Sequence, residues 1–201
     1  MKTEQEEFWQ GEFGDAYTDR NAPPSLKSNL NLFAKVLSKT SGVRTVYEVG
    51  TNRGLNLDAL RHLLPDARLH GIEINHKAAA IAAGKGHQIE VGSVLSCQEA
   101  RTFDLVFTRG VLIHINPAEL PAVYDFMGRI AGKYILVDEY FSPHPVAIDY
   151  RGNKERLFKR DFAKEIMDRL SLELVDYGFT WKHDPNFPLD DSTWFLFRKT
   201  R

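Results

Sequence analysis

Apolar residues along the chain fall into two patterns, short continuous runs and longer segments with apolar positions at helical spacing. The runs predict strands over residues 43–49, 67–74, 87–94, 103–108, 133–139, 172–182 and 194–198. Helices are predicted over residues 4–11, 25–39, 55–64, from 75 onward, 117–130 and 161–170, and residues 13–21 are expected to connect the first two. Strands that alternate with helices predict an α/β fold. We expect a Rossmann-like doubly wound sheet of seven strands, with the last strand antiparallel and helices flanking the sheet.

The first apolar run ends in a glycine-punctuated turn, YEVGTNRG over residues 47–54. Gly50 permits a tight turn and a close approach of a ligand to the backbone, and Gly54 lets the next helix begin near the strand. A pyrophosphate cradle has the pattern G-x-G-x-x-G, whose middle glycine is missing here, with Asn52 near its place. The turn therefore predicts a nucleoside-type ligand that lacks a pyrophosphate.

Glu48 stands at the end of this predicted strand. A carboxylate there would repel a pyrophosphate but attract the ammonium group of a methionine moiety. This favours S-adenosylmethionine (SAM) as the cofactor over a nicotinamide dinucleotide. The alternative is a structural carboxylate that caps a helix or pairs with an arginine.

A second acidic residue, Glu73, ends the next predicted strand, about 20 residues past the glycine turn, where a carboxylate binds a ribose diol. The alternative is an ordinary exposed residue at a strand end. Ser93, after the third predicted strand, is placed to meet the adenine, although Gly-Ser pairs are common in turns. The full set of expected cofactor contacts is Tyr17, Arg20, Glu48, Gly50, Asn52, Gly54, Glu73, Ile74, Ser93, Val94, Thr108, Arg109 and Gly110.

Composition limits the classes of partner. The chain has 201 residues with 26 basic and 27 acidic side chains, a net charge of −1, so nucleic acid and anionic membranes exert no general attraction. We expect a single domain over residues 1–201, with residues 1–40 as a helical lid segment. The single cysteine, Cys97, and an acidic start without a signal pattern predict a cytoplasmic protein. The aspartates at positions 184, 190 and 191 lack metal-ligand spacing and are interpreted as turn residues, so no metal site is expected.

Two segments outside the cofactor motifs are candidates for ligand contact. Tyr17, Arg20 and Asn21 are expected to form part of the lid, with Arg20 as a two-pronged partner for the cofactor carboxylate. Residues 150–160 are basic and lie in a long connection, where Tyr150 and Arg151 would meet a carboxylate or phosphate of the acceptor. The alternative for both segments is a solvated, charged surface.

A resemblance to a known family rests on five segments that go beyond the generic cofactor motifs. They are FWQGEFGDAYTDRN at 8–21, FDLVFTRGVLIHINP at 103–117, YRG at 150–152, LFKRDF at 157–162 and DPNFP at 184–188. With them the chain resembles class I SAM-dependent methyltransferases, and more narrowly the bacterial pseudaminic acid biosynthesis-associated methylases. This resemblance implies methyl transfer to an oxygen or nitrogen of a small, sugar-derived acceptor in surface-glycan or flagellin-sugar biosynthesis. The acceptor implied is an acidic or nucleotide-linked sugar.

Methyl transfer from SAM needs alignment of the acceptor and the removal of a proton. His114, shortly after the fourth predicted strand, is the leading candidate base, and Glu139 and Tyr140 at the end of the fifth strand follow. Each has a structural alternative: His114 as a packed residue bonded to backbone, and Glu139 as a carboxylate paired with an arginine.

Two further functions stay open at the level of sequence. A non-catalytic SAM-binding protein of a glycan-assembly complex would share every cofactor motif. A nicotinamide-dependent oxidoreductase would share the fold class, but the incomplete G-x-G-x-x-G pattern argues against it.

Overall fold

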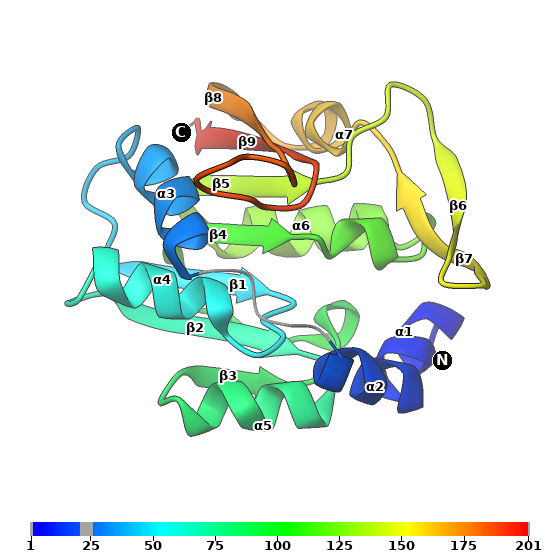
Figure 1. The fold of residues 1–201 in the computed structure, drawn as a ribbon. Coiled ribbons are helices and arrows are strands. Elements are labelled where there is room, and N and C mark those ends of the chain that lie inside the picture. Colours follow the sequence, from blue (N-terminus) through cyan, green and yellow to red (C-terminus); the bar gives the residue numbers. More distant parts are fainter. Residues whose placement is uncertain (1, 21–25, 201) are drawn as a thin grey trace.

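A computed structural model describes residues 2–20 and 26–200 of the chain (Figure 1). Within them a seven-stranded sheet has the order β3-β2-β1-β4-β5-β9-β8. Its strands are β1 (Thr45–Val49), β2 (Arg68–Glu73), β3 (Gln88–Val91), β4 (Phe103–Arg109), β5 (Ala131–Glu139), β8 (Leu172–Thr180) and β9 (Ser192–Lys199). β1 to β5 pair in parallel, whereas β9 runs antiparallel to both β5 and β8. The expected fold class is confirmed.

Helices cover both faces of this sheet. α3 (Leu26–Leu37) and α4 (Leu55–Leu63) pack on one face, and α6 (Leu120–Ile130) and α7 (Phe162–Arg169) on the other (Figure 1). α5 (His76–Gly84) lies beside β3. Because strand side chains alternate between faces, Val46 belongs to the core under α3 and α4, and Tyr47 to the core under α6. The same alternation decides which polar residues at the strand ends meet.

The N-terminal helix pair, α1 (Glu4–Gln10) and α2 (Glu12–Arg20), lies at the carboxyl ends of the parallel strands (Figure 1). Thr3 and Glu6 form a capping box that begins α1. The sequence predicted a connection over residues 13–21, but residues 12–20 are helical. At Gly14 a side chain would overlap the carbonyl oxygen of Trp9, so the two helices pack closely there. Asn21 and Ser25, which the sequence placed in the lid and at a helix start, lie outside the described residues.

A second sheet is formed by the hairpin β6 (Val146–Tyr150) and β7 (Asn153–Lys159), which the sequence suggested only as a long basic connection. It projects from the same edge as α1 and α2 (Figure 1). Two 3₁₀ turns, η1 (Val94–Ser96) and η2 (Leu112–His114), also lie at this edge. α6 begins at Leu120, three residues after Pro117, because residues 117–119 form a turn. Every helix described in residues 2–20 and 26–200 falls short of the length and apolar character needed to cross a bilayer.

Candidate functional site

Two adjoining cavities open at the carboxyl ends of the parallel strands. The first lies above β1, β2 and β4, and its walls include Gly50, Asn52, Glu73, Ile74, Ser93 and Val94. The second lies between the ends of β4 and β5, the β6–β7 hairpin and the β8–β9 connection, and its walls include Tyr140, Tyr150, Arg151 and Asp190. Tyr17, Asn52, Arg109, Gly110 and His114 line both cavities. Ligands in the two cavities would therefore meet at these five residues.

The glycine turn after β1 forms the floor of the first cavity. Gly50 has φ 74° and Gly54 has φ 76°, and Asn52 also adopts a left-handed conformation at φ 47°. A side chain at Gly50 would overlap that of Val111, which follows β4. Glycine is therefore required here both for the positive φ angle and for the close approach to Val111. Gly54 lies outside the cavity walls, close to His87, and begins α4. The roles predicted for both glycines in turn geometry agree with these positions.

Glu73 is almost fully buried at the end of β2, on the wall of the first cavity. Its Oε2 accepts from the amide of Asn52 at 2.6 Å, and its Oε1 accepts from the amide of Asn75 at 2.8 Å. Burial raises the pKa of the Glu73 carboxyl in spite of these two hydrogen bonds. The carboxylate thus ties the glycine turn to the start of α5 and keeps free lone pairs for a ligand.

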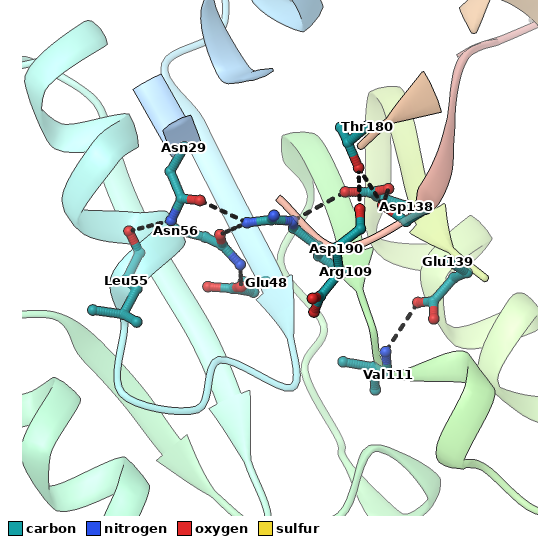
Figure 2. Close-up of polar contacts among 11 residues, drawn as sticks. Asn29, Glu48, Leu55, Asn56, Arg109, Val111, Asp138, Glu139, Thr180 and Asp190 are labelled. Carbon is teal, nitrogen blue, oxygen red and sulfur yellow. Dashed lines mark hydrogen bonds and ion pairs between the residues drawn. The ribbon is translucent and has the colours of Figure 1, made fainter. Parts of the chain in front are cut away.

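Glu48 is fully buried at the end of β1. Its Oε1 accepts from Asn56 Nδ2 at 2.7 Å, but its buried Oε2 has no hydrogen-bond partner among the described residues (Figure 2). Burial raises the pKa of Glu48 well above its usual range, against the opposing effects of Asn56 and Arg109. An unpartnered buried carboxylate oxygen costs stability, and a cationic ligand would remove that cost.

Arg109, at the end of β4, joins the two cavities through a buried polar network (Figure 2). Its Nε donates to Asp138 Oδ2 at 3.0 Å, and its Nη1 donates to Asn29 Oδ1 at 2.8 Å and Asn56 Oδ1 at 2.9 Å. Ser192 donates to the other Asp138 oxygen at 2.6 Å. The guanidinium is therefore held by protein groups and fixes Asn56, which in turn holds Glu48.

Sequence reasoning missed Asn29, Asn56 and Asp138 in this network. The alternation of side chains along a strand could have revealed Asp138. It follows Tyr134 and Leu136 on the same buried face of β5, so its carboxylate would be expected to be buried too. Asn29 and Asn56 carried no such signal, because a polar residue on a helix is usually a solvated one.

His114 lies in η2 and lines both cavities. Its Nδ1 donates to the carbonyl of Arg156 at 2.6 Å, which leaves the lone pair on Nε2. Its ring lies 4.5 Å from that of Trp9 and 5.0 Å from that of Tyr150, centroid to centroid. Burial lowers the pKa of His114 to about 4, so the ring is neutral near pH 7.

Glu139 and Tyr140 point to different surroundings, although they are adjacent in sequence. The Glu139 carboxylate accepts from the amides of Val111, Leu112 and Ile113 at 3.1, 3.1 and 3.3 Å, and so caps η2. It is not among the residues that line the two cavities, and burial raises its pKa to about 7. This position favours a structural role for Glu139 over a catalytic one. Tyr140 lines the second cavity.

The remaining predicted residues divide into two groups. Gly110 lines both cavities, and Tyr150 and Arg151 line the second. Thr108 is fully buried within β4, and Arg20 is exposed with its guanidinium 5.3 Å above the ring of Phe13. Neither of these last two contributes to the walls of the cavities. Lys182, Asp190 and Ser192 of the second cavity had no predicted role in ligand binding.

The N-terminal helix pair covers the first cavity and is hydrogen-bonded to β7 and to the start of α5. Gln5 donates to the carbonyl of Glu155 in β7 at 3.1 Å. Asn75, which begins α5, donates to Asp15 at 2.8 Å. Gln5, Glu6 and Trp9 contribute to the cavity wall.

No family model matches the chain, and no curated protein matches it. The fold is similar to that of solved methyltransferases. Magnesium protoporphyrin IX methyltransferase from Synechocystis with bound SAM has a TM-score of 0.71 at 13% identity, covering 99% of each chain. A sugar N-methyltransferase from Streptoalloteichus has a TM-score of 0.68 at 15% identity, covering 96% of this chain and 94% of that one. An amino pentose methyltransferase from Micromonospora echinaspora has a TM-score of 0.66 at 12% identity, covering 94% and 96%. At these identities the similarity establishes a shared fold, that of class I SAM-dependent methyltransferases.

Proposed function

We propose that the chain is a SAM-dependent methyltransferase that methylates an oxygen or nitrogen of a small, sugar-derived acceptor in surface-glycan or flagellin-sugar biosynthesis. The observation that carries this proposal is the pair of cavities that share Tyr17, Asn52, Arg109, Gly110 and His114. One cavity has the features that suit a nucleoside cofactor, and the other is open to an acceptor. The sugar and the pathway follow the sequence resemblance, and two fold neighbours named as sugar or amino pentose methyltransferases support them.

The residues of the first cavity fit SAM. Glu48 does not line either cavity, but it directly precedes Val49 and Gly50 on the wall of the first, and its unpartnered Oε2 would suit a cation such as the ammonium group of the methionine moiety. Glu73 suits the ribose diol, and Ile74, Ser93 and Val94 suit the adenine. Added side chains at Gly92 and Gly110 would meet no atom within 4 Å, so the backbone there borders open space. Tyr17 and Trp9 of the N-terminal helix pair would cover the bound cofactor.

SAM supplies an activated methyl group on a sulfonium. The chain has to orient the acceptor, exclude water and receive a proton. His114 is the proposed proton acceptor, because its Nε2 keeps a lone pair and its ring lies where the cavities meet. Its pKa of about 4 makes it a weak base, so orientation contributes more than proton transfer. A His114→Asn variant with full activity would remove the ring from this role.

Arg151 on the hairpin provides positive charge in the second cavity, together with Lys182 on the connection after β8, which also pairs with Asp191 at 3.6 Å. Both are exposed, and they suit a carboxylate or phosphate at the outer end of the acceptor. This supports an acidic or nucleotide-linked sugar as the acceptor.

Calorimetric titration with SAM, with its demethylated product S-adenosylhomocysteine (SAH) and with NAD tests the cofactor. We expect micromolar or tighter binding of SAM and SAH, at about −8 kcal/mol, and no response to NAD. Binding of NAD without SAM would favour the oxidoreductase. SAM binding without turnover across acidic and nucleotide-linked sugars would favour the non-catalytic alternative.

A further inference from the structure

Granted the proposed function, on which this inference rests, we propose that the second cavity binds the acceptor through a cationic amino group. The Asp190 carboxylate would hold this group among the side chains of Tyr17, Tyr140 and Tyr150. The atom that is methylated would then be nitrogen.

The backbone of Asp190 is anchored by a hydrogen bond, and its side chain points into the second cavity. Its carbonyl accepts from Thr180 Oγ1 at 2.6 Å, which anchors the β8–β9 connection to the end of β8. Figure 2 shows the carboxylate pointing away from Thr180, into the space beyond Arg109. The residue belongs to the wall of the second cavity, so the negative charge faces the acceptor space.

The charge of Asp190 is available to a ligand in a way that the other nearby carboxylates are not. Asp138, also on the cavity wall, is neutralised by Arg109 at 3.0 Å. Asp191 pairs with Lys182 at 3.6 Å. The structure gives Asp190 no ion-pair partner among the described residues. A cation that enters the cavity would therefore find a carboxylate that hydrogen-bonds to the Tyr140 phenol but is not neutralised by a cationic side chain.

Three tyrosines surround the position that this carboxylate faces. Tyr17, Tyr140 and Tyr150 all line the second cavity. Burial raises the pKa of the Tyr140 phenol most, and the negative charge of Asp190 and a hydrogen bond between the phenol and that carboxylate raise it further, so these two side chains are in contact. Tyrosine ring faces attract cations, and the Tyr140 ring already has Lys159 Nζ at 5.3 Å from its centroid. Neutral phenols and a single carboxylate suit an ammonium group better than a hydroxyl.

The position also suits methyl transfer, because Tyr17 lines both cavities. An acceptor ammonium gives one proton to Nε2 of His114, which lines both cavities and passes the proton to water, while the Asp190 carboxylate keeps its charge. The amine lone pair then forms the C–N bond while the C–S bond of the sulfonium breaks and its electron pair stays on sulfur. The products are a methylammonium and a neutral thioether. The methylated nitrogen keeps its positive charge, so the same groups hold it.

The test uses choline and 3,3-dimethyl-1-butanol, two probes with the same shape that differ in charge. They are titrated into the SAH-loaded protein by ligand-observed NMR. We expect choline to bind about tenfold more tightly than the alcohol. This is the effect expected of one contact between a cation and a carboxylate, strengthened by neighbouring aromatic rings. Asp190→Asn should abolish this preference while SAH affinity stays unchanged. The matched control is Asp191→Asn, in which the preference should remain.

Equal affinity of the wild type for the two probes, or a preference retained in Asp190→Asn, would overturn the cation site. The titrations are repeated without SAH, so that the site is measured separately from the cofactor. Failure of SAH to bind while the choline preference persists would overturn the proposed function and leave the cation site intact.

Discussion

Four carboxylates at the ends of β1, β2 and β5 are almost completely buried: Glu48, Glu73, Asp138 and Glu139. Burial raises the pKa of each one, and each has different partners. Asp138 has an arginine and a serine, Glu139 has three amides, and Glu73 has two amides beside a cavity. Glu48 keeps one oxygen unpartnered among the described residues. At the residue scale, the hydrogen-bond partners of a buried carboxylate therefore distinguish a structural role from a role in ligand binding.

Glu73→Ala should weaken SAH binding at least about tenfold, because a charge-assisted hydrogen bond to a ribose hydroxyl contributes about 1.5–3 kcal/mol. Calorimetry measures the change, and Asp66→Ala, at an exposed position before β2, is the control. Since Glu73 also anchors two amides, thermal unfolding of the variant should be recorded alongside. An unchanged affinity would remove the ribose assignment.

His114 gives a prediction about pH. Its pKa is about 4 in the folded chain and about 6.5 when unfolded, so between these values only the unfolded chain binds the proton. The contribution to stability is therefore complete above pH 6.5 and is lost as the pH falls to 4. Because the ring is partly exposed, we expect this loss to be about 1–2 kcal/mol.

Urea unfolding of the wild type and of His114→Asn at pH 4.5 and pH 7 measures this contribution of His114 to the free energy of unfolding. The difference in stability between the two proteins should change with pH in favour of the variant at pH 4.5. A difference that is the same at both pH values would contradict the lowered pKa.

At the scale of elements, strand alternation decides which strand-end residues act together. Asp138 and Glu139 face opposite sides of β5, where Asp138 meets Arg109 and Glu139 meets η2. Asp138 thus joins the arginine network, whereas Glu139 holds the three amides that begin η2. The short turn that carries His114 is therefore positioned by a carboxylate from the neighbouring strand.

Glu139→Ala should destabilise the chain by about 2–4 kcal/mol, because it leaves buried amides of η2 without an acceptor. Glu139→Gln keeps an acceptor oxygen and should lose less than half as much. Equilibrium unfolding at pH 8 checks both variants. If alanine and glutamine behaved alike, the amides would not depend on this side chain.

At the scale of the whole molecule, the proposed site is assembled from segments far apart in the chain. The N-terminal helix pair is bonded to β7 through Gln5 and to the start of α5 through Asp15. The β6–β7 hairpin and the β8–β9 connection complete the second cavity. We infer that the helix pair acts as the lid over bound cofactor.

Gly14→Ala tests the lid, because the added methyl would overlap the Trp9 carbonyl and separate α1 from α2. We expect the SAH dissociation rate to rise about tenfold, which corresponds to about 1.4 kcal/mol of lost lid contacts. Stopped-flow competition measures the rate. Gly84→Ala, where a side chain meets no atom within 4 Å, is the matched control in α5. Equal dissociation rates in the two variants would show that the helix pair does not retain the ligand.

Much of the fold was readable from the sequence. Apolar runs identified all seven strands of the main sheet, including the reversed pairing of the last. The strands differ from prediction mainly by a few residues at their ends. The prediction failed for α2 and for the β6–β7 hairpin, whose residues are mostly polar or exposed. Such segments are held by contacts with the rest of the molecule, as between Gln5 and Glu155, and carry little periodicity of their own.

The sequence by itself determined the parallel sheet and the place of the glycine turn, because hydrophobic period and glycine dihedrals are local properties. Those same properties put Glu48 and Glu73 at strand ends. Only the tertiary structure decided which of the polar residues face a cavity. Glu139 bonds to the amides of η2, Arg109 pairs with Asp138, and Asp190 lies on the wall of the second cavity. The reason is that the partners of a buried charge come from other strands and connections, and the sequence order does not show which of them meet.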